Sequence, residues 1–562
     1  MAEAAVSPRL VDLASPIGRL DADEILARFV DWSSERGLVP YPAQEEAFLE
    51  LVAGKHVVLA TPTGSGKSLV ATLLHFKAMC EGRRPFYTSP VKALVSEKFF
   101  ALCQDFGPEN VGMLTGDASI NSAAPIICCT AEVLANMALR SGTALDAPYV
   151  VMDEFHFYSD AQRGVAWQVP LLLMRDTAFL LMSATLGDTR EIRRDLELRS
   201  GRPVALVASS ERPVPLDYAW RETPLHETVE ALLESGKAPI YVVSFTQREA
   251  AELAQALTSL NVTSRAERLE IGAALGDFEF DTAYGKELSR IVRAGIGIHH
   301  AGLLPKYRLR VEQLAQQGLL KVISGTDTLG VGVNIPIRTV LFTKLAKFDG
   351  RRVGALSVRE FRQISGRAGR KGFDERGSVV CQAPEHVIEN KRMRERSSKS
   401  GGKKRKREVT RKPPPGFVGW SEESFERLIE RAPEPLVSRF RVSHGTIVLL
   451  LRRAEDDPDP RGGWRAVADL IARSHESDAR KRRILREAAQ LFRGLRAADI
   501  VRVERDAATG RRRVRVADDL QWDFSLHHAL SLYVVEAISY IEARDEAFAF
   551  EVLSLVEAVL ED

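Results

Sequence analysis

Two short polar strings in this 562-residue sequence contain the residue types that phosphate chemistry requires. The first, residues 61–68 (TPTGSGKS), follows an apolar, β-branched run and precedes a helical pattern. Backbone N–H groups of such a loop can cradle phosphates, while Lys67 can reach the β- and γ-phosphates and Ser68 can bind Mg²⁺. Thr61 stands where the strict pattern has glycine, so a plain Gly/Ser turn is the alternative. The residues expected at the phosphates are Thr63, Gly64, Ser65, Gly66, Lys67 and Ser68.

The second string is a pair of carboxylates, Asp153 and Glu154, directly after the apolar run 149–152. Ligands of open parallel sheets bind where the strands end, which is where this pair is expected to lie. Asp153 can hold Mg²⁺, and Glu154 can orient and deprotonate an attacking water. A solvated turn is the usual alternative for an acidic pair. The loop at 61–68, about 85 residues upstream, favours a catalytic site instead.

The elements that must position these strings alternate between short apolar runs and longer helical patterns from about residue 57 to 380. This alternation predicts two α/β units of similar size, each a parallel sheet covered by helices. The segment 202–214 has prolines near both ends and no helical pattern, so we expect a linker there. Strands are expected at 56–60, 85–88, 126–129, 149–152 and 178–182, and then at 240–244, 320–324, 338–342 and 377–381.

Composition excludes several classes of protein. The chain is 45% hydrophobic and 27% charged, which argues against wholesale disorder and collagen-like structure. Its five cysteines include no CxxC spacing, so neither a zinc site nor a disulfide framework is expected, and a reduced intracellular setting fits. No apolar run approaches the roughly 18 residues of a membrane span. We therefore expect a cytoplasmic protein that does not engage membranes.

The composition changes at 391–412, which holds twelve basic and two acidic residues. A mobile linker, an arm that grips nucleic acid and a localisation signal are the three alternatives. Helical patterns follow at 421–430, 441–453 and 478–496, and a hairpin pattern at 499–504 and 511–516. Helices followed by a hairpin suggest a winged helix-turn-helix. Apolar residues at helical spacing in 526–560 indicate the start of a helical domain.

Taken together, the motifs resemble those of superfamily-two helicases. The resemblance is to the superkiller-type DExH-box branch, which includes exosome-associated RNA helicases and an archaeal-type DNA repair helicase. Residues 41–44 (YPAQ) resemble the adenine-reading glutamine motif, with Gln44 at the base. The resemblance implies coupling of hydrolysis to domain movement through His156, Ser183 and Thr185. It also implies contacts to a nucleic-acid backbone at Pro90, Lys92, Thr115, Gly116, Thr130 and Thr326.

In the second unit the string 363–370 (QISGRAGR) is the most specific part of the resemblance, which extends from about residue 41 to 377. It implies that Gln363, Arg367 and Arg370 complete the catalytic site, with the arginines as fingers, when the two units close on ATP and Mg²⁺. Segment 297–305 (GIHHAGLLP) is similar to a stretch typical of this branch. The string 332–336 (GVNIP) resembles the next motif, which implies nucleotide contacts at Gly332 and Asn334.

Three further segments resemble accessory parts of this branch. Residues 348–352 (FDGRR) occupy the place of a strand-parting hairpin, with a plain connecting loop as the alternative. Residues 438–442 and 447–452 resemble the start of a winged-helix domain, after which relatives have a helical bundle. The sequence is expected to stop inside that bundle, either because it is truncated or because this member is reduced.

The resemblance implies an α/β fold of two tandem RecA-like domains followed by a winged helix and the start of a helical bundle. The expected boundaries are 1–205 and 206–390 for the two motor domains, 391–415 for the basic linker, 416–520 for the winged helix and 521–562 for the bundle. The implied activity is that of an ATP-dependent helicase, acting first of all on single-stranded RNA and tailed duplexes with 3′-to-5′ polarity. A DNA helicase in repair or recombination, and an RNA-binding assembly platform with a vestigial ATPase, are the alternatives. A monomer that works with RNA-degradation or RNA-processing proteins is expected.

Overall fold

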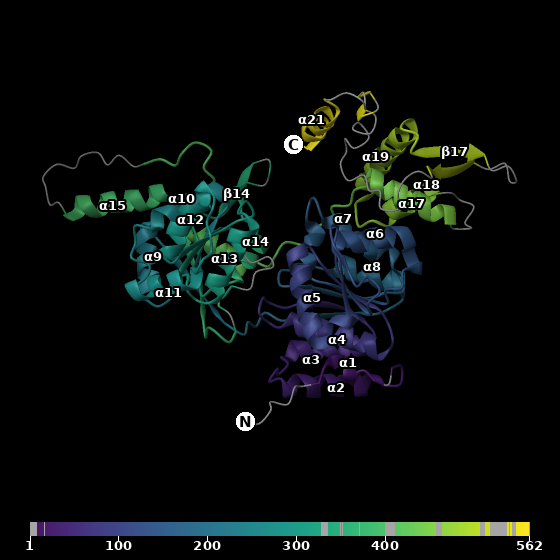
Figure 1. Cartoon of the computed structure of the whole chain (residues 1–562), viewed down its shortest axis with the longest axis horizontal. Helices are drawn as coiled ribbons and strands as arrows, with labels where there is room; N and C mark the ends of the chain where they lie inside the picture. The colour runs from purple at the N-terminus through teal and green to yellow at the C-terminus, as the bar shows by residue number, and fades with distance from the viewer. Residues whose placement is uncertain are drawn as a thin grey trace.

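The computed structural model describes residues 8–15, 17–327, 335–348, 350, 352–369, 371–399, 411–456, 463–505, 512–517, 537–538, 540–541 and 547–560. Within these residues the chain builds two parallel sheets, each covered by helices, and then a helical C-terminal part (Figure 1). No described helix combines the length and the apolar character needed to cross a bilayer.

The first sheet has eight strands in the order β4-β3-β5-β2-β6-β7-β1-β8. All neighbours are parallel except β3 and β4. The strands are β1 (His56–Ala60), β2 (Pro85–Ser89), β3 (Val111–Leu114), β4 (Ser119–Ile120), β5 (Ile126–Thr130), β6 (Tyr149–Met152), β7 (Ala178–Ser183) and β8 (Val204–Ala208). Because β7 lies between β1 and β6, the segments that follow these three strands meet at one edge of the sheet.

Both faces of this sheet are buried, since successive side chains of a strand point to opposite faces. In β1, Val57 and Leu59 pack in one core and Val58 in the other. The first core contains residues of α1 (Leu10–Leu13), α2 (Ala22–Glu35), α3 (Pro42–Val52), α4 (Lys67–Cys80) and α5 (Lys92–Phe106). The second contains residues of α6 (Ala131–Ser141), α7 (Gly164–Leu173) and α8 (Arg190–Ser200).

The second sheet has six parallel strands in the order β11-β12-β10-β13-β16-β9. They are β9 (Leu216–Arg221), β10 (Ile240–Ser244), β11 (Ile296–His299), β12 (Val322–Thr326), β13 (Thr339–Phe342) and β16 (Gly377–Gln382). The associated helices are α9 (Leu225–Glu234), α10 (Gln247–Leu257), α11 (Arg265–Leu275), α12 (Ala283–Arg293), α13 (Pro305–Gln316) and α14 (Val358–Ser365). Both sheets fit RecA-like domains, the fold class predicted from the sequence.

The predicted linker at 202–214 is wrong in its first half. Residues Val204–Ala208 form β8, an edge strand parallel to β1, in which Val207 is fully buried. Pro203 precedes this strand and Pro213 follows it, and an edge strand tolerates proline outside its paired residues. The boundary predicted at residue 205 therefore falls inside β8, and the connection to β9 consists of residues 209–215.

A two-stranded hairpin replaces the plain-loop alternative at 348–352. Strands β14 (Ala346–Phe348) and β15 (Val353–Ala355) pair antiparallel, and Gly350 between them has a φ of 94°, which favours glycine. Residues 349 and 351 lie outside the described part of the chain. Lys347 of β14 pairs with Asp327 at 3.1 Å and with Glu360 at 2.6 Å, which connects the hairpin to the start of α14.

The C-terminal part begins with α15 (Glu385–Lys399), so the first residues of the basic segment, 391–399, are helical. Residues 400–410 lie outside the described residues. The three predicted helices are confirmed as α16 (Glu422–Glu430), α17 (His444–Asp456) and α19 (Asp478–Ala497), and α18 (Gly463–Arg473) adds a fourth. The predicted hairpin is confirmed as antiparallel β17 (Val501–Arg505) and β18 (Arg512–Val516). Of the expected helix at 526–560, the structure describes α21 (Phe548–Leu560) and a few residues before it.

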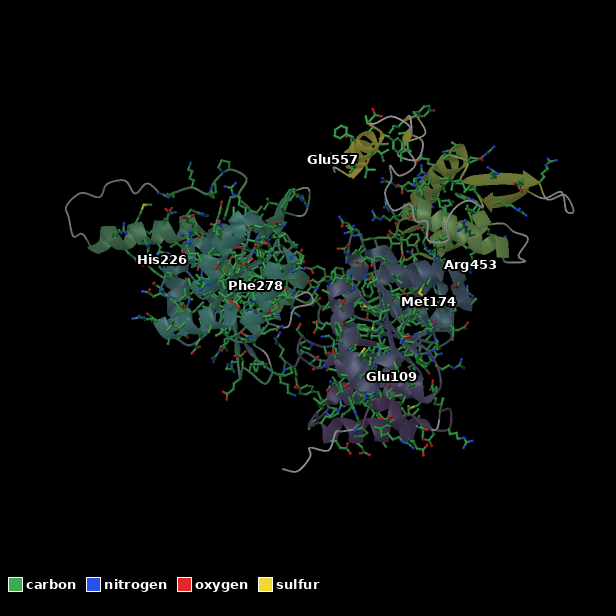
Figure 2. All side chains as sticks on the ribbon, viewed as in Figure 1. Glu109, Met174, His226, Phe278, Arg453 and Glu557 are labelled. Carbon is green, nitrogen blue, oxygen red and sulfur yellow. The ribbon has the colours of Figure 1, made fainter. Side chains whose placement is uncertain are left out.

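The C-terminal helices divide between the two units. Phe425 of α16 packs edge-on against Phe361 of α14, with ring centroids 5.7 Å apart, in the core of the second unit. Ile447 and Leu451 of α17 are fully buried in the core that contains α6 and α7 of the first unit. Arg453, labelled in Figure 2, lies at the far end of α17 and abuts Gly142 of the first unit. The chain between α16 and α17 therefore passes from the second unit to the first, and we call residues 431–437 the strap.

Candidate active site between the two sheets

The loop at 61–68 joins β1 to the N-terminus of α4. Gly64 and Gly66 have φ values of 84° and 73°, the left-handed region in which a Cβ is unfavourable. The Ser65 hydroxyl donates to Thr61 Oγ1 at 2.7 Å and is within 2.8 Å of the Pro62 carbonyl, so this side chain braces the loop from inside. The free N–H groups at the start of α4 make this loop a natural site for an anion.

Lys67, Ser68 and the two carboxylates line one cavity of about 710 Å³. Lys67 Nζ donates to the carbonyl oxygens of Thr61 and Pro62, both at 3.0 Å. Burial lowers the pKa of Lys67, and Glu154 and Asp153 act against that effect. Thr63, Gly64 and Gly66 line the same cavity, so the structure brings both predicted strings together.

Asp153 is held by two hydrogen bonds. Its Oδ1 accepts from the backbone N–H of Glu154 at 2.9 Å, and its Oδ2 accepts from the hydroxyl of Tyr87 on β2. Burial and the neighbouring Glu154 raise the pKa of Asp153. The Ser68 hydroxyl and the Asp153 carboxylate are hard oxygen ligands on one cavity wall, a donor set that suits Mg²⁺ bound together with phosphates.

Glu154 has a φ of 53°, which is uncommon for a non-glycine residue. Its Oε2 lies 3.2 Å from His156 Nδ1, and that nitrogen lies 2.9 Å from Ser183 Oγ. Burial opposes ionisation, but His156, Lys67 and Arg367 outweigh it and lower the pKa of Glu154 to about 2. Ser183 Oγ also accepts from the backbone N–H of Thr185 at 3.2 Å. The three residues predicted to couple hydrolysis to movement, His156, Ser183 and Thr185, are thus connected to Glu154 by a continuous series of polar contacts.

Helix α14 of the second unit and the residues after it lie close to this series of contacts. Gln363 Nε2 lies 3.3 Å from Thr185 Oγ1. Arg367 is half-buried, and its buried Nε has no hydrogen-bond partner among the residues that the structure describes. Burial lowers the pKa of Arg367, whereas Tyr241 and Glu154 act in the opposite direction. A guanidinium that lowers the pKa of Glu154 and has a buried, free Nε donor fits a phosphate group. Arg370, Gly332 and Asn334 lie outside the described residues.

The predicted adenine-reading residue, Gln44, is buried against the loop. Its Nε2 donates to the Gly66 carbonyl at 2.7 Å, and its Oε1 accepts from the Tyr41 backbone N–H at 2.8 Å. Lys371 of the second unit lies over the Tyr41 ring, with Nζ 4.5 Å from the centroid. The base-binding role of Gln44 stays a prediction.

The predicted nucleic-acid contacts lie at the carboxyl ends of strands. Lys92 Nζ pairs with Asp117 at 2.6 Å, and Thr115 Oγ1 donates to the same carboxylate at 2.9 Å. Thr130 ends β5 and precedes α6, and Thr326 ends β12. Pro90 and Gly116 follow β2 and β3. In the first unit this is the edge of the sheet that also carries the phosphate-binding loop.

Motif reasoning missed two residues of the site, Tyr87 and Arg212. Tyr87 reads in the sequence as an ordinary strand residue, and only its hydroxyl contact with Asp153 reveals a role. Arg212 lies in the connection between the sheets and donates through Nη2 to the Gly366 and Ala368 carbonyls, both at 3.2 Å. It also shares a cavity of about 130 Å³ with Gln44 and Lys67. Neither residue belongs to a motif, so the sequence alone offered no signal for them.

Replacing Tyr87 with Phe is expected to weaken divalent-metal binding by about tenfold, because residues that orient a metal ligand are typically worth that much. The lost hydroxyl leaves Asp153 Oδ2 free to turn away from the metal position. Binding of Mn²⁺ in the presence of ADP, measured by electron paramagnetic resonance, checks this. Tyr149→Phe is the matched control, because the Tyr149 hydroxyl contacts Glu81 and Lys77 instead. Equal Mn²⁺ affinity in Tyr87→Phe and wild type would contradict the role.

The fold and the site define two RecA-like domains with a loop suited to phosphate in the first. Residues 41–192 match the DEAD/DEAH box helicase family, and residues 277–372 match the helicase conserved C-terminal domain. Residues 383–562 match a domain of unknown function, DUF3516. The last match covers the C-terminal helices and the strap, so the family models leave that part without a role.

Three curated proteins illustrate the similarity. The ATP-dependent RNA helicase mtr4 of Schizosaccharomyces pombe is 30% identical over 417 residues, which are 62% of this chain and 37% of that protein. Superkiller complex protein 2 of Mus musculus is 28% identical over 547 residues, 82% of this chain and 41% of that protein. The probable helicase HelY of Mycobacterium tuberculosis is 32% identical over 410 residues, 61% of this chain and 45% of that protein. The chain thus spans less than half the length of these relatives. With these matches, the chain carries both helicase domains of superfamily two and is similar to superkiller-type helicases.

Proposed function

We propose that this protein is an ATP-dependent helicase of the DExH type that translocates along single-stranded RNA. The observation that carries the proposal is the meeting of the two units beside Glu154: Gln363 Nε2 of the second unit lies 3.3 Å from Thr185 Oγ1 of the first, and Arg367 helps to lower the pKa of Glu154. A catalytic site divided between two units is assembled by closure and dissolved by opening. Hydrolysis is therefore tied to domain movement.

The residues have separate tasks in this proposal. The loop amides and Lys67 bind the β- and γ-phosphates, and Ser68 and Asp153 hold Mg²⁺. Glu154, ionised and positioned by His156, takes a proton from the attacking water. Arg367, with Gln363 and Arg370, stabilises the charge on the phosphoryl group in transfer. Bound Mg²⁺ supplies neutralisation of the phosphate charge. Gln44, Gly332 and Asn334 hold the nucleotide. The contacts from His156 through Ser183 to Thr185 couple hydrolysis of the nucleotide to movement of the second unit.

We propose a backbone-reading track for the nucleic acid at Pro90, Lys92, Thr115, Gly116, Thr130 and Thr326. Contacts to the backbone position a strand without reading its sequence, so low base specificity is expected. RNA is favoured because one relative is named an ATP-dependent RNA helicase and another a superkiller complex protein. Polarity of 3′ to 5′, a cytoplasmic monomer and RNA-degradation partners belong to the same proposal. So do a strand-parting role for the β14–β15 hairpin, a winged-helix domain at 416–520 and the start of a helical bundle at 521–562.

The test is unwinding of 3′-tailed and 5′-tailed RNA–RNA, RNA–DNA and DNA–DNA duplexes side by side. The proposal expects ATP-dependent unwinding of 3′-tailed substrates with an RNA loading strand. Unwinding only of DNA duplexes would replace it with the DNA-repair alternative. ATP turnover that does not respond to single-stranded RNA, together with tight RNA binding, would support the assembly platform with a vestigial ATPase instead.

A further inference from the structure

The strap lies between the two units and belongs to the segment without an assigned function. On the side of the second unit, Arg362 of α14 donates through Nη2 to the carbonyl oxygens of Ile429 at 3.2 Å and Arg431 at 2.5 Å. On the side of the first unit, the Val437 backbone N–H donates to Ser159 Oγ at 2.8 Å. The strap is therefore attached to α14 at one end and to the segment just after Glu154 at the other.

Glu434, in the middle of the strap, accepts hydrogen bonds from the first backbone N–H groups of α14. The first N–H groups of a helix have no partner inside the helix. Glu434 accepts from two of them, Val358 N–H to Oε1 at 2.7 Å and Arg359 N–H to Oε2 at 3.1 Å. The next, that of Glu360, donates to the Ser357 side chain at 3.2 Å. A carboxylate at a helix N-terminus also interacts favourably with the helix dipole.

The same part of the strap touches the first unit. Arg359 donates to the Glu434 carbonyl oxygen and, through Nε, to the Thr185 carbonyl at 3.2 Å. Gly187 lies so close that a side chain there would collide with the Glu434 and Pro433 carbonyls. Pro433 and Pro435 flank Glu434, and their fixed φ makes this part of the strap stiff. Glu434 and Arg359 thus connect the start of α14 to the loop that carries Thr185.

We propose that Glu434 is a positioning residue for ATP hydrolysis, which sets α14 against Thr185. This inference rests on the proposed function of the site. Helix α14 has eight residues, carries Gln363 and ends two residues before Arg367. A displacement of its first turn moves both side chains relative to Glu154. The segment of unknown function therefore contributes to the catalytic site without touching the nucleotide, by fixing the helix that presents the finger.

The test compares Glu434→Ala, Glu434→Gln and Gly187→Ala with wild type in the full chain. Glu426→Gln is the matched control, because Glu426 is an exposed glutamate on neighbouring α16. Hydrogen exchange of residues 358–361, followed by mass spectrometry, reports the capping contacts and needs no hydrolysis. Steady-state ATP turnover with single-stranded RNA reports the catalytic consequence as separate kcat and KM values.

We expect exchange of residues 358–361 to become about tenfold faster in Glu434→Ala, since two charge-assisted hydrogen bonds are lost. We expect kcat to fall about tenfold to a hundredfold in Glu434→Ala and Gly187→Ala, and less in Glu434→Gln, with KM for ATP nearly unchanged. Combining Glu434→Gln with Gly187→Ala should add little, because both changes act through the strap.

Unchanged exchange in Glu434→Ala overturns the inference whatever the turnover. So does unchanged kcat in a chain whose wild type hydrolyses ATP. The inference is also overturned if turnover falls only in proportion to the folded fraction measured by thermal unfolding. In that case Glu434 would stabilise the fold without positioning α14. Absence of hydrolysis in wild type overturns the proposed function and with it the catalytic role of Glu434, and the exchange result then reports the capping contact alone.

Discussion

Arg367→Ala is expected to lower RNA-stimulated ATP turnover by about 10³ to 10⁵-fold, which corresponds to roughly 4 to 7 kcal/mol in the transition state. The Arg367 side chain is half-buried, lowers the pKa of Glu154, and has a buried Nε without a partner among the described residues. Such a donor stabilises charge that develops on a phosphoryl group in transfer. Because Arg367 belongs to the second unit, a protein without this side chain could still close on ATP but would hydrolyse it slowly.

The measurement is kcat at saturating ATP and RNA, with fluorescent nucleotide binding as a second readout. Binding of ATP should change only a few-fold, because the loop and Lys67 belong to the first unit. Arg367→Lys should recover little, since an ammonium does not reproduce the planar donor pair of arginine. Arg248→Ala on α10 is the control, because Arg248 is exposed and pairs with Glu252. Near-wild-type turnover in Arg367→Ala would show that Arg367 is not an arginine finger.

Glu154→Gln is expected to reduce turnover by about 10² to 10⁴-fold while ATP still binds. The pKa of Glu154 is lowered to about 2 by His156, Lys67 and Arg367 against the effect of burial, so the carboxylate is ionised at neutral pH. Glutamine keeps the shape of the side chain but cannot accept the proton of the attacking water. The change therefore removes the base and leaves the phosphate-binding residues in place.

Single-turnover hydrolysis and nucleotide binding together check this expectation. Glu191→Gln on α8 is the matched control, since Glu191 is exposed and belongs to none of the predicted motifs. Glu154→Gln should still bind RNA tightly with ATP, because closure does not require the base. If ATP turnover does not respond to Glu154→Gln, the proposal of an active ATPase is wrong and the assembly platform with a vestigial ATPase is favoured.

The secondary structure could be predicted where the pattern is strong and local. The strand expected at 56–60 is confirmed as β1, and the hairpin expected at 499–504 and 511–516 is confirmed as β17 and β18. Strand β8 was missed because it lies at an edge and is flanked by prolines that suggest a linker. Strand β11 (Ile296–His299) was missed because Gly297 interrupts its apolar run.

The residues of the candidate site divide in the same way. Lys67, Asp153 and Glu154 were predicted because each stands in a motif with a defined strand and loop around it. Tyr87, Arg212 and Glu434 are ordinary residues in ordinary segments. Their roles follow only from contacts with residues far away in the chain, such as Glu434 with Val358 or Tyr87 with Asp153.

By itself the sequence determined the chemistry that each half of the molecule offers. The reason is that a phosphate-binding loop or an acidic pair needs only a few neighbouring residues in particular backbone conformations, such as the left-handed Gly64 and Gly66. The tertiary structure alone decided which residues of the two halves face each other and what holds them there. Packing of α16 on the second unit and α17 on the first places the strap between them, and such long-range packing leaves no local pattern in the sequence.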